Sequence, residues 1–376
     1  MRILVLVHEF PPIGGGGGRV SEDICRELVK RGHEIKVLTS HIRGLPFEEE
    51  RDGFQVTRLW SVRTQSYRAS FLSMASYVFM GFWAALKLLR HWRPDLIHVH
   101  FAVPAGALAW ILFRLTGIPY LLTSHLGDVP GGVPEKTKDW FRYVYPFTPS
   151  IWKDARWVVV VSKYTKQLAE RHYPVPMDVI PNGIDLTLGG REPLVVHTPP
   201  RIMFAGRFVP QKNPLQVVEA LARLKDLDWE CVMLGDGPLL EPVKRSIARH
   251  GMQDRFTLPG WVTPEDVIQW FGTGDILFMP SLSEGLPVVG VQALVRGLAV
   301  VASRVGGFLD LVDEGRNGYL FPSDDEDSMV EVLRSFLTDH AKLLEARQHS
   351  LRVVTRFDIV AIADAYEKIL GKVARS

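Results

Sequence analysis

Residues 1–20 read MRILVLVHEFPPIGGGGGRV, and this stretch decides the fold that the sequence predicts. The apolar run 3–7 has the length of a buried strand, and the five glycines 14–18 follow it before a helical pattern begins near Val20. Glycine lets the backbone approach a ligand closely, and the first amides of a helix attract anions such as phosphate. The stretch therefore predicts a strand, an anion-binding turn and a helix; a merely flexible glycine loop is the alternative interpretation.

Short apolar runs alternate with helical patterns along the chain, which is typical of parallel sheets covered by helices on both faces. The predicted strands are 3–7, 34–39, 54–59, 95–100, 120–123 and 157–161 in the first half, and 201–205, 230–234, 275–279 and 299–302 in the second. Residues 186–200 hold glycines and prolines without a helical period and predict a linker. We therefore predict an α/β protein with two Rossmann-like domains, at 1–185 and 201–356.

Composition excludes several classes of protein. The chain has 376 residues, 47% hydrophobic and 23% charged, which is too apolar for a disordered protein. A net charge of +2 is too small for a dedicated nucleic-acid binder. Only two cysteines occur, Cys25 and Cys231, which make neither a disulfide framework nor a metal cluster and fit a reducing compartment. Because no signal-peptide pattern precedes the first strand, we expect a cytoplasmic protein.

Residues 53–94 form a basic segment without any acidic residue. Its cations are Arg58, Arg63, Arg68, Lys87, Arg90 and Arg93, with Trp60, Trp83 and Trp92 among them. Residues 69–86 carry no charge and reach the lower limit for a membrane span, but serines interrupt the run, so we expect a buried or membrane-apposed helix. Basic residues with aromatic neighbours predict contact with an anionic membrane or a phosphorylated acceptor; a solvated basic face is the alternative.

Polar residues that follow the strands of the first half mark a candidate site. Ligands of open α/β sheets bind outside the carboxyl ends of strands, where His100, His125 and Asp128 are predicted to lie. We expect His98 to be packed within its strand and His125 to donate a hydrogen bond to a substrate oxygen. Residues 40–41 offer no carboxylate for an adenosine ribose, which argues against a dinucleotide-dependent dehydrogenase. The histidine spacing matches no metal-binding pattern.

The second half carries an anion-binding pattern at two strand ends. Gly206 and Arg207 end one strand and Lys212 follows at the mouth of a helix, so two cations fall where a phosphate would bind. A chance pair of cations is the alternative interpretation. Glu284 follows another strand and can accept hydrogen bonds from sugar hydroxyls, while Gln292 faces the same region from the next helix. A second anion cradle is predicted from the backbone amides near Gly285, Leu286, Pro287 and Val288.

These motifs, in this order, resemble those of glycosyltransferase family 4. The matching segments are PP at 11–12 with GG at 15–16, RGHE at 31–34, HVH at 98–100, TSHLGD at 123–128, PNGID at 181–185, GR at 206–207 with Lys212, GDG at 235–237, SLSEGLP at 281–287 and VGG at 305–307. The resemblance spans nearly the whole chain and implies a GT-B fold, in which two Rossmann-like domains face each other across a cleft. It also implies that the helical pattern 359–373 crosses back to the first domain, which then comprises 1–185 and 357–376.

The family pattern assigns the donor-side residues of the second domain. Arg207 and Lys212 match the residues that bind the donor diphosphate. Glu284 matches the first glutamate of the E-x7-E motif, which holds hydroxyls of the donor sugar. The second glutamate of that motif holds the nucleotide ribose, and it is Gln292 here. Glutamine keeps an acceptor oxygen but loses the charge, so we expect altered ribose binding with activity retained.

The pattern also assigns residues of the first domain. His125 matches the histidine placed near the donor sugar, and Gly15 and Gly16 match the loop that closes on phosphate and acceptor. We assign His100 and Asp128 to the acceptor side.

The resemblance implies a retaining glycosyltransferase that moves a hexosyl unit from a UDP- or GDP-linked sugar to a glycan, polyol or lipid-linked acceptor. Fixed cations and amides would stabilise the departing diphosphate, so no divalent metal ion and no cofactor are expected. A nucleotide-sugar epimerase on the same fold and a catalytically silent glycan-binding protein, motivated by Gln292, stay open as alternatives. We expect the protein in the cytoplasm, with peripheral contact at the inner face of the plasma membrane.

Overall fold

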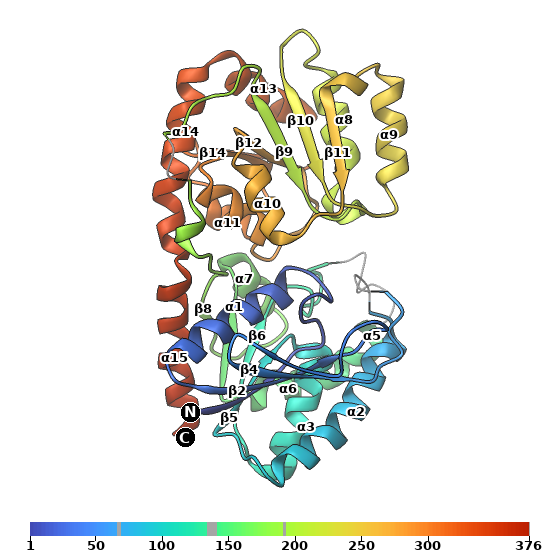
Figure 1. The fold of residues 1–376 in the computed structure, drawn as a ribbon, viewed down its shortest axis with the longest axis vertical. Coiled ribbons are helices and arrows are strands. Elements are labelled where there is room, and N and C mark those ends of the chain that lie inside the picture. The colour runs from blue at the N-terminus through green and yellow to red at the C-terminus, as the bar shows by residue number, and fades with distance from the viewer. Residues whose placement is uncertain (66–68, 134–140, 191–192, 376) are drawn as a thin grey trace. The chain divides into compact units, whose positions relative to one another are not determined.

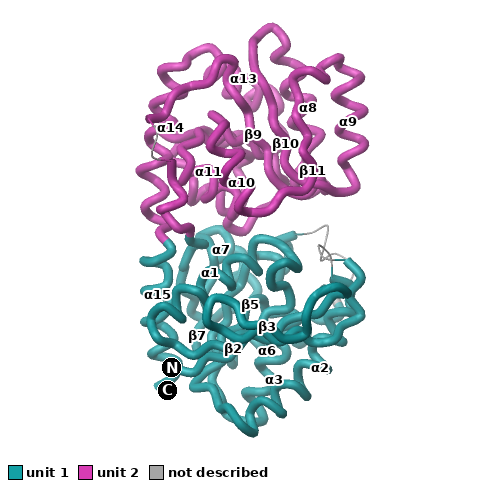
Figure 2. Tube along the Cα trace, in the orientation of Figure 1, with its two compact units in different colours: residues 1–183, 359–376 teal, residues 184–358 magenta. Residues whose placement is uncertain are grey.

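The computed structural model describes residues 1–65, 69–133, 141–190 and 193–375. The chain forms two compact units, one of residues 1–183 with 359–376 and the other of residues 184–358 (Figure 2). Each unit is built around its own sheet, with helices packed on the sheet (Figure 1). The alternation of apolar runs and helical patterns therefore predicted the fold class correctly.

The sheet of the first unit has the strand order β3-β4-β2-β1-β5-β6-β7-β8. Neighbouring strands are parallel except β3 and β4, which form an antiparallel hairpin. All six strands predicted for this half are present, and β3 and β8 are additional. The strands are β1 (Arg2–Leu6), β2 (Glu34–Ser40), β3 (Glu48–Arg51), β4 (Phe54–Leu59), β5 (Leu96–His100), β6 (Tyr120–Ser124), β7 (Trp157–Val160) and β8 (Asp178–Val179).

Successive residues of a strand point to opposite faces, so each face of this sheet has its own core. Leu4 and Leu6 of β1 belong to one core, together with Tyr77, Leu108 and Trp152 from three helices. The opposite face is covered by the first and last helices of the chain. The helices of this unit are α1 (Gly16–Lys30), α2 (Phe71–Leu89), α3 (Ala107–Thr116), α5 (Phe141–Val144), α6 (Thr148–Asp154), α7 (Lys163–Glu170) and α15 (Ile359–Ala374).

The C-terminal helix α15 packs in the first unit, as the resemblance implies. Its buried Tyr366 lies beside the ring of His98, and the Tyr366 hydroxyl is 3.4 Å from Thr123 Oγ1. Thr123 Oγ1 is also 3.0 Å from His98 Nε2. His98 is therefore a packed strand histidine, as predicted, and it connects β5 and β6 to α15.

The sheet of the second unit has the order β11-β10-β9-β12-β13-β14, and its strands are all parallel. The four strands predicted for this half are present, and β11 and β14 are additional. The strands are β9 (Arg201–Ala205), β10 (Glu230–Leu234), β11 (Phe256–Gly260), β12 (Ile276–Met279), β13 (Ala299–Ser303) and β14 (Gly318–Phe321). The helices are α8 (Pro214–Ala222), α9 (Leu240–Arg249), α10 (Pro264–Phe271), α11 (Val288–Val295), α12 (Phe308–Leu311), α13 (Glu326–Thr338) and α14 (His340–Val353).

The segment predicted as a linker belongs to the second unit, where a buried carboxylate holds it. Asp275 has no exposed surface and accepts hydrogen bonds from His197 and from the backbone amide of Arg201. The guanidinium of Arg347 on α14 pairs with the same carboxylate and donates to the carbonyl oxygen of Val195. One ion pair therefore joins the segment before β9, the start of β12 and helix α14.

We expect Arg347→Met to destabilise the second unit by about 3–5 kcal/mol, because the change leaves Asp275 buried without its counter-charge. Urea unfolding monitored by circular dichroism measures the effect. Arg334→Met is the matched control, since Arg334 pairs with Asp226 at the exposed surface, and it should not move the unfolding midpoint measurably. Equal midpoints for the two variants would contradict the role given to Asp275.

Candidate functional site

The second unit brings the predicted cation Lys212 and the predicted carboxylate Glu284 into contact. Lys212 ends the turn η4 (Pro210–Lys212) after β9, and Glu284 lies in the loop after β12. Lys212 Nζ donates to Glu284 Oε1 over 2.5 Å, and only 14% and 6% of the two side chains are exposed. Salt screens a pair this buried only weakly, so each charge fixes the position of the other. Residues 72 positions apart thus form one polar cluster at the carboxyl edge of the sheet.

Close contacts between loops hold Glu284 in place. The amide of Leu282 donates to the carbonyl oxygen of Gln211 over 2.8 Å, and Gln211 Nε2 donates to the carbonyl oxygen of Ser283 over 3.0 Å. On another side, Gly306 has a φ of 56°, and a Cβ there would lie 1.7 Å from the carbonyl oxygen of Glu284. Only glycine permits that approach, so the loop is fixed by backbone contacts.

Helix α11 begins beside this carboxylate, after Gly285, Leu286 and Pro287. No side chain of the described residues caps its start at Val288, and the first amides of a helix have no partner within it. The helix dipole adds partial positive charge at this end. Arg207, which follows Gly206 at the end of β9, is half-buried on the same edge of the sheet. This edge is therefore suited to an anion.

Gln292, which replaces the second motif glutamate, is mostly buried on α11. Its Nε2 donates to the carbonyl oxygen of Pro264 over 3.3 Å. Since that bond uses the amide nitrogen, the amide oxygen stays available as an acceptor. The contact of Gln292 with a ribose stays a prediction.

In the first unit, His100 and His125 form a pair at the ends of β5 and β6. His100 Nδ1 and His125 Nε2 are 3.0 Å apart. His100 is fully buried, and within the described part of the chain its Nε2 has no hydrogen-bond partner. A buried N–H without a partner is rarer than a buried acceptor without one, so we assign the His100 proton to Nδ1, which donates to His125. His125 then carries its own proton on Nδ1, where it can donate to a ligand.

Burial keeps the imidazoles of this edge neutral. It lowers the pKa of His98 and of His125 to about 3 and the pKa of His8 to about 4. Burial, His98 and His125 together hold the pKa of His100 well below its usual range. A general base works best when its pKa is near the operating pH. His125 is therefore suited to donating a hydrogen bond and poorly suited to removing a proton.

Two residues with left-handed backbone, Phe101 and Leu126, follow the two histidines. Their φ angles are 72° and 82°, in a region that costs a non-glycine residue about 1 kcal/mol or more. The ring centroids of Phe101 and His125 are 4.6 Å apart. A Cβ on Gly17 would lie 2.5 Å from the Phe101 ring. Such strain concentrates at functional sites. The sequence reading missed Phe101, because a phenylalanine after a strand carries no turn signal.

Asp128, predicted on the acceptor side, is fully engaged inside the first unit. It is 2% exposed and accepts hydrogen bonds from the amides of Ala102 and His125 and from the Ser124 hydroxyl. Burial raises the pKa of Asp128, and these hydrogen bonds oppose that effect. The carboxylate thus joins the turns after β5 and β6 and positions His125.

The glycine run forms the turn before α1, with Gly15 at the cap and Gly16 as the first helical residue. A Cβ on Gly18 would lie 2.4 Å from the carbonyl oxygen of Glu9, so this glycine is required by packing. A Cβ on Gly15 would meet no atom within 4 Å. The run is therefore an ordered turn and helix start, in which Gly15 borders open space.

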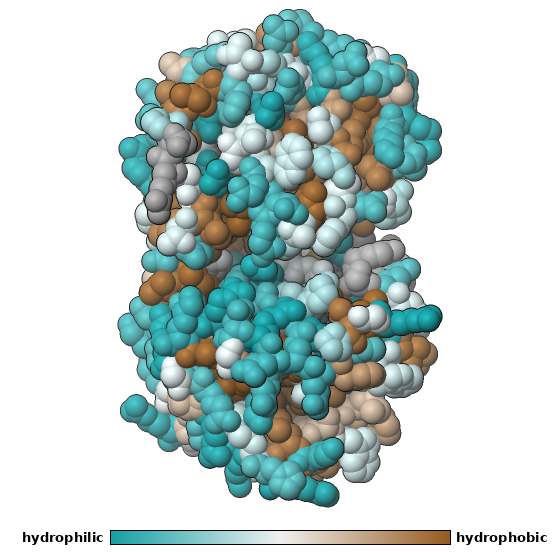
Figure 3. Space-filling model, viewed as in Figure 1, coloured by the Kyte–Doolittle hydropathy of each residue, from teal (hydrophilic) through white to brown (hydrophobic). Residues whose placement is uncertain are grey.

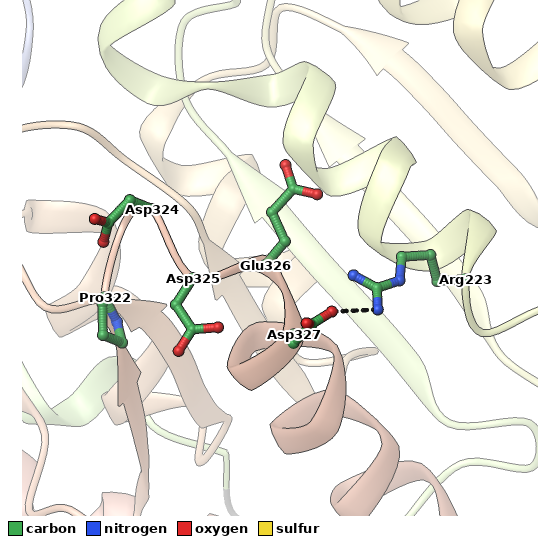
Figure 4. Close-up of a pocket in the computed structure, with 6 residues that line it drawn as sticks. All are labelled: Arg223, Pro322, Asp324, Asp325, Glu326 and Asp327. Carbon is green, nitrogen blue, oxygen red and sulfur yellow. Dashed lines mark hydrogen bonds and ion pairs between the residues drawn. The ribbon is translucent and has the colours of Figure 1, made fainter.

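A pocket of about 550 Å³ in the second unit is acidic and is unsuited to a diphosphate. Arg223, Pro322, Asp324, Asp325, Glu326 and Asp327 line it, and Asp327 Oδ1 pairs with Arg223 Nη2 over 2.6 Å (Figure 4). Asp325 is occupied as the cap of α13. Among the described residues, no group of three or more His, Cys, Asp or Glu side chains could hold a metal ion.

Comparison with known families identifies the family to which a chain with this fold belongs. Residues 14–188 match the model described as Glycosyltransferase Family 4, and residues 191–350 match that of Glycosyl transferases group 1. The chain belongs to glycosyltransferase family 4.

Individual relatives agree with this assignment. The 2-deoxystreptamine glucosyltransferase of Streptomyces kanamyceticus is 27% identical over 93% of this chain and 98% of its own. Sucrose-phosphate synthase from Thermosynechococcus elongatus has a TM-score of 0.87 over the whole of both chains at 19% identity. HepE of Anabaena, solved with UDP and glucose, has a TM-score of 0.78 at 19% identity over 99% of this chain and all of its own. The structural matches show the GT-B fold.

We expect the imidazoles of His98 and His125 to stay neutral from pH 8 to pH 5. The pKa is about 6.5 in the unfolded chain and about 3 in the folded one, so only the unfolded chain takes up protons as the pH falls. Stability is therefore complete above pH ~6.5 and is lost toward pH ~3, at up to ~1.4 kcal/mol per pH unit for each histidine. Histidine-selective NMR measures the protonation directly; a His125 signal that titrates near pH 6.5 would contradict the burial argument.

Proposed function

We propose that the protein is a retaining glycosyltransferase that moves a hexosyl unit from a UDP- or GDP-linked sugar to a glycan, polyol or lipid-linked acceptor. The observation that carries the proposal is the contact of Lys212 with Glu284 beside the uncapped start of α11. A phosphate-binding cation and a sugar-binding carboxylate are the two recognition elements that a nucleotide sugar requires. The names of the relatives suggest glucose as the first sugar to test in the donor and UDP as the first nucleotide.

The leaving diphosphate is the group that this edge is proposed to stabilise. Cleavage of the sugar–phosphate bond creates an oxocarbenium-like centre and a departing anion, and fixed positive groups lower the energy of that state. Arg207, Lys212 and the first amides of α11 are assigned this task, and no metal ion or cofactor is assigned. Glu284 is proposed to hold hydroxyls of the transferred sugar, Gln292 the ribose, and the Nδ1–H of His125 a sugar oxygen.

We expect Lys212→Met and Arg207→Met each to lower turnover by at least ~10²-fold, the effect of removing one charge stabiliser. Radiolabelled UDP- and GDP-sugars, followed for transfer and for slow hydrolysis, measure it. Lys244→Met is the matched control, because Lys244 pairs with Glu241 at the surface of α9. Wild-type rates in both test variants would overturn the phosphate assignment, and interconversion of sugars without transfer would indicate an epimerase.

A cytoplasmic location with peripheral membrane contact is also proposed, and α2 supports it. Among the described residues, α2 is the one helix whose length and composition would allow it to cross a membrane. Its inner face is committed to the core, where Tyr77 donates to the carbonyl oxygen of Leu38. The outer face exposes Leu72, Phe79 and Trp83 at 62%, 63% and 56%. Figure 3 shows apolar residues gathered over α2.

The spacing of these side chains fits a helix that lies on a bilayer surface. Leu72, Phe79 and Trp83 recur at helical intervals along one stripe, and Lys87 and Arg90 continue it at the C-terminal end. Apolar anchors can enter the headgroup region while the cations contact anionic lipid. Of the two contacts predicted for the basic segment, α2 thus favours a membrane.

We expect the double change Phe79→Glu and Trp83→Glu to weaken binding to phosphatidylglycerol vesicles at least tenfold, because two apolar anchors become anionic. Co-sedimentation with vesicles measures binding, and high salt should weaken the wild type because it screens Lys87 and Arg90. Val360→Glu is the control, a substitution of another exposed apolar residue on α15. A wild type that stays in solution with anionic vesicles would overturn the membrane proposal.

A further inference from the structure

A second cavity, of about 430 Å³, lies at the carboxyl ends of β2 and β4 in the first unit. One wall is the loop 41–47 that follows β2, and the other is the segment 60–63 that follows β4. None of the residues assigned above to the donor or to the histidine pair lines it. The feature therefore needs an explanation of its own.

The walls of this cavity are ordered and aromatic. The rings of His41 and Phe47 stack with centroids 4.0 Å apart and planes within 5°. His41 Nε2 donates to the carbonyl oxygen of Leu45 over 2.8 Å, and the Ser61 hydroxyl donates to the carbonyl oxygen of His41 over 2.9 Å. The first bond holds the loop 41–47 together, and the second joins the two walls. Trp60 stays 54% exposed, so its indole offers a flat apolar surface.

The charge of the cavity is positive. Two arginines, Arg43 and Arg63, line it, and its described lining includes no aspartate or glutamate. Arg63 is almost completely buried and is held by Glu9 Oε1 over 2.9 Å and by the carbonyl oxygen of Gln65. Arg43 is exposed, and its planar guanidinium suits phosphate or carboxylate. Because Arg63 already pairs with Glu9, Arg43 is the lining cation that this cavity presents to a ligand.

A row of contacts connects this cavity to the histidine pair along one edge of the sheet. Arg63 binds Glu9, which follows His8 in the chain, and the His8 ring lies 5.4 Å from that of Phe101. Phe101 in turn lies 4.6 Å from His125. The strands β2, β1, β5 and β6 lie in this order, so about 14 Å separates the ends of β2 and β6. One sugar ring cannot reach from the cavity to His125, but an extended acceptor can.

We propose that this cavity binds the part of the acceptor distal to the reacting hydroxyl, and that this part is a saccharide or polyol ring next to a phosphate-type anion. Trp60 covers the apolar face of the ring, and Arg43 binds the anion. The proposal rests on the glycosyltransferase function proposed above and adds the acceptor class to it. The same chemistry occurs in a free sugar phosphate and in a lipid-linked one.

Hexose 1-phosphate and methyl α-hexoside are the probes for this assignment, used with UDP and GDP at saturation to fill the donor edge. We expect Arg43→Ala to weaken binding of the phosphate at least fivefold, with the methyl glycoside changed by less than twofold. Trp60→Ala should weaken both ligands at least fivefold, because both present the same ring. Saturation-transfer NMR measures the affinities. Both residues are exposed, so the variants are expected to fold.

Arg93→Ala and Phe147→Ala serve as matched controls, since they remove an exposed arginine and an exposed aromatic ring elsewhere in the first unit. Donor hydrolysis is measured separately on the same protein preparations, with UDP- and GDP-sugars in place of the free nucleotides. If the wild type hydrolyses the donor, two results overturn the cavity assignment. One is an unchanged affinity in both test variants, and the other is no binding of hexose 1-phosphate to the wild type. A wild type that neither hydrolyses nor transfers any donor sugar would instead overturn the proposed function.

A second arm distinguishes the two sources of the anion. The same hexose is presented on a polyprenyl phosphate in phosphatidylcholine vesicles. Tighter binding in vesicles that is lowered by Trp83→Ala assigns a lipid-linked acceptor, because Trp83 lies on the exposed stripe of α2. Tighter binding of the soluble probe assigns a free sugar phosphate. Either assignment requires that Trp60→Ala and Arg43→Ala lower the affinity for the probe. An equal loss of affinity in the control variants would contradict both assignments.

Discussion

Parallel strand pairing is the constraint on which both polar edges of this protein depend. In a parallel sheet every strand ends at the same edge, so residues far apart in the sequence converge there. In the first unit this brings His100 and His125 within 3.0 Å, and in the second it brings Lys212 within 2.5 Å of Glu284. The loops that carry these residues must approach one another closely, and Gly306 shows the limit, with no room even for a Cβ.

The contact between Lys212 and Glu284 also affects which ligand the carboxyl edge of the second sheet can bind. Burying either charge alone would cost desolvation free energy, and the ion pair offsets that cost for both side chains. An ammonium group has three donors, so the bond to Glu284 leaves two for a second anion. A phosphate therefore need not displace the carboxylate. A cation fixed before the ligand arrives also avoids reorganisation during the reaction, which is where electrostatic stabilisation is most effective.

The sequence predicted the buried strands well and the edge strands poorly, for a physical reason. Central parallel strands are apolar on both faces and appear as continuous runs, as in Ile3 to Val7. The missed strand β3 reads EEER because an edge strand in a solvated hairpin need not be apolar, and β11 contains a proline. The predicted ends of the strands pointed to His125, Lys212 and Glu284 as separate candidate site residues. Their partners depend on distances across the sheet, which no single run of residues encodes.

The carboxyl edges of the two sheets differ in charge, and sugar transfer would use them for different tasks. On the second unit Lys212 forms a buried ion pair with Glu284, and a fixed cation suits the stabilisation of an anion. On the first unit burial keeps His98, His100 and His125 neutral, so these side chains add no positive charge to their edge of the sheet. A neutral imidazole with a pKa of about 3 is a weak base but still a good hydrogen-bond donor. The strained Phe101 and the occupied carboxylate of Asp128 then have a common explanation, because both position that donor at the end of β6. We therefore propose that the polar residues of the first unit orient the sugar and that those of the second stabilise the leaving charge.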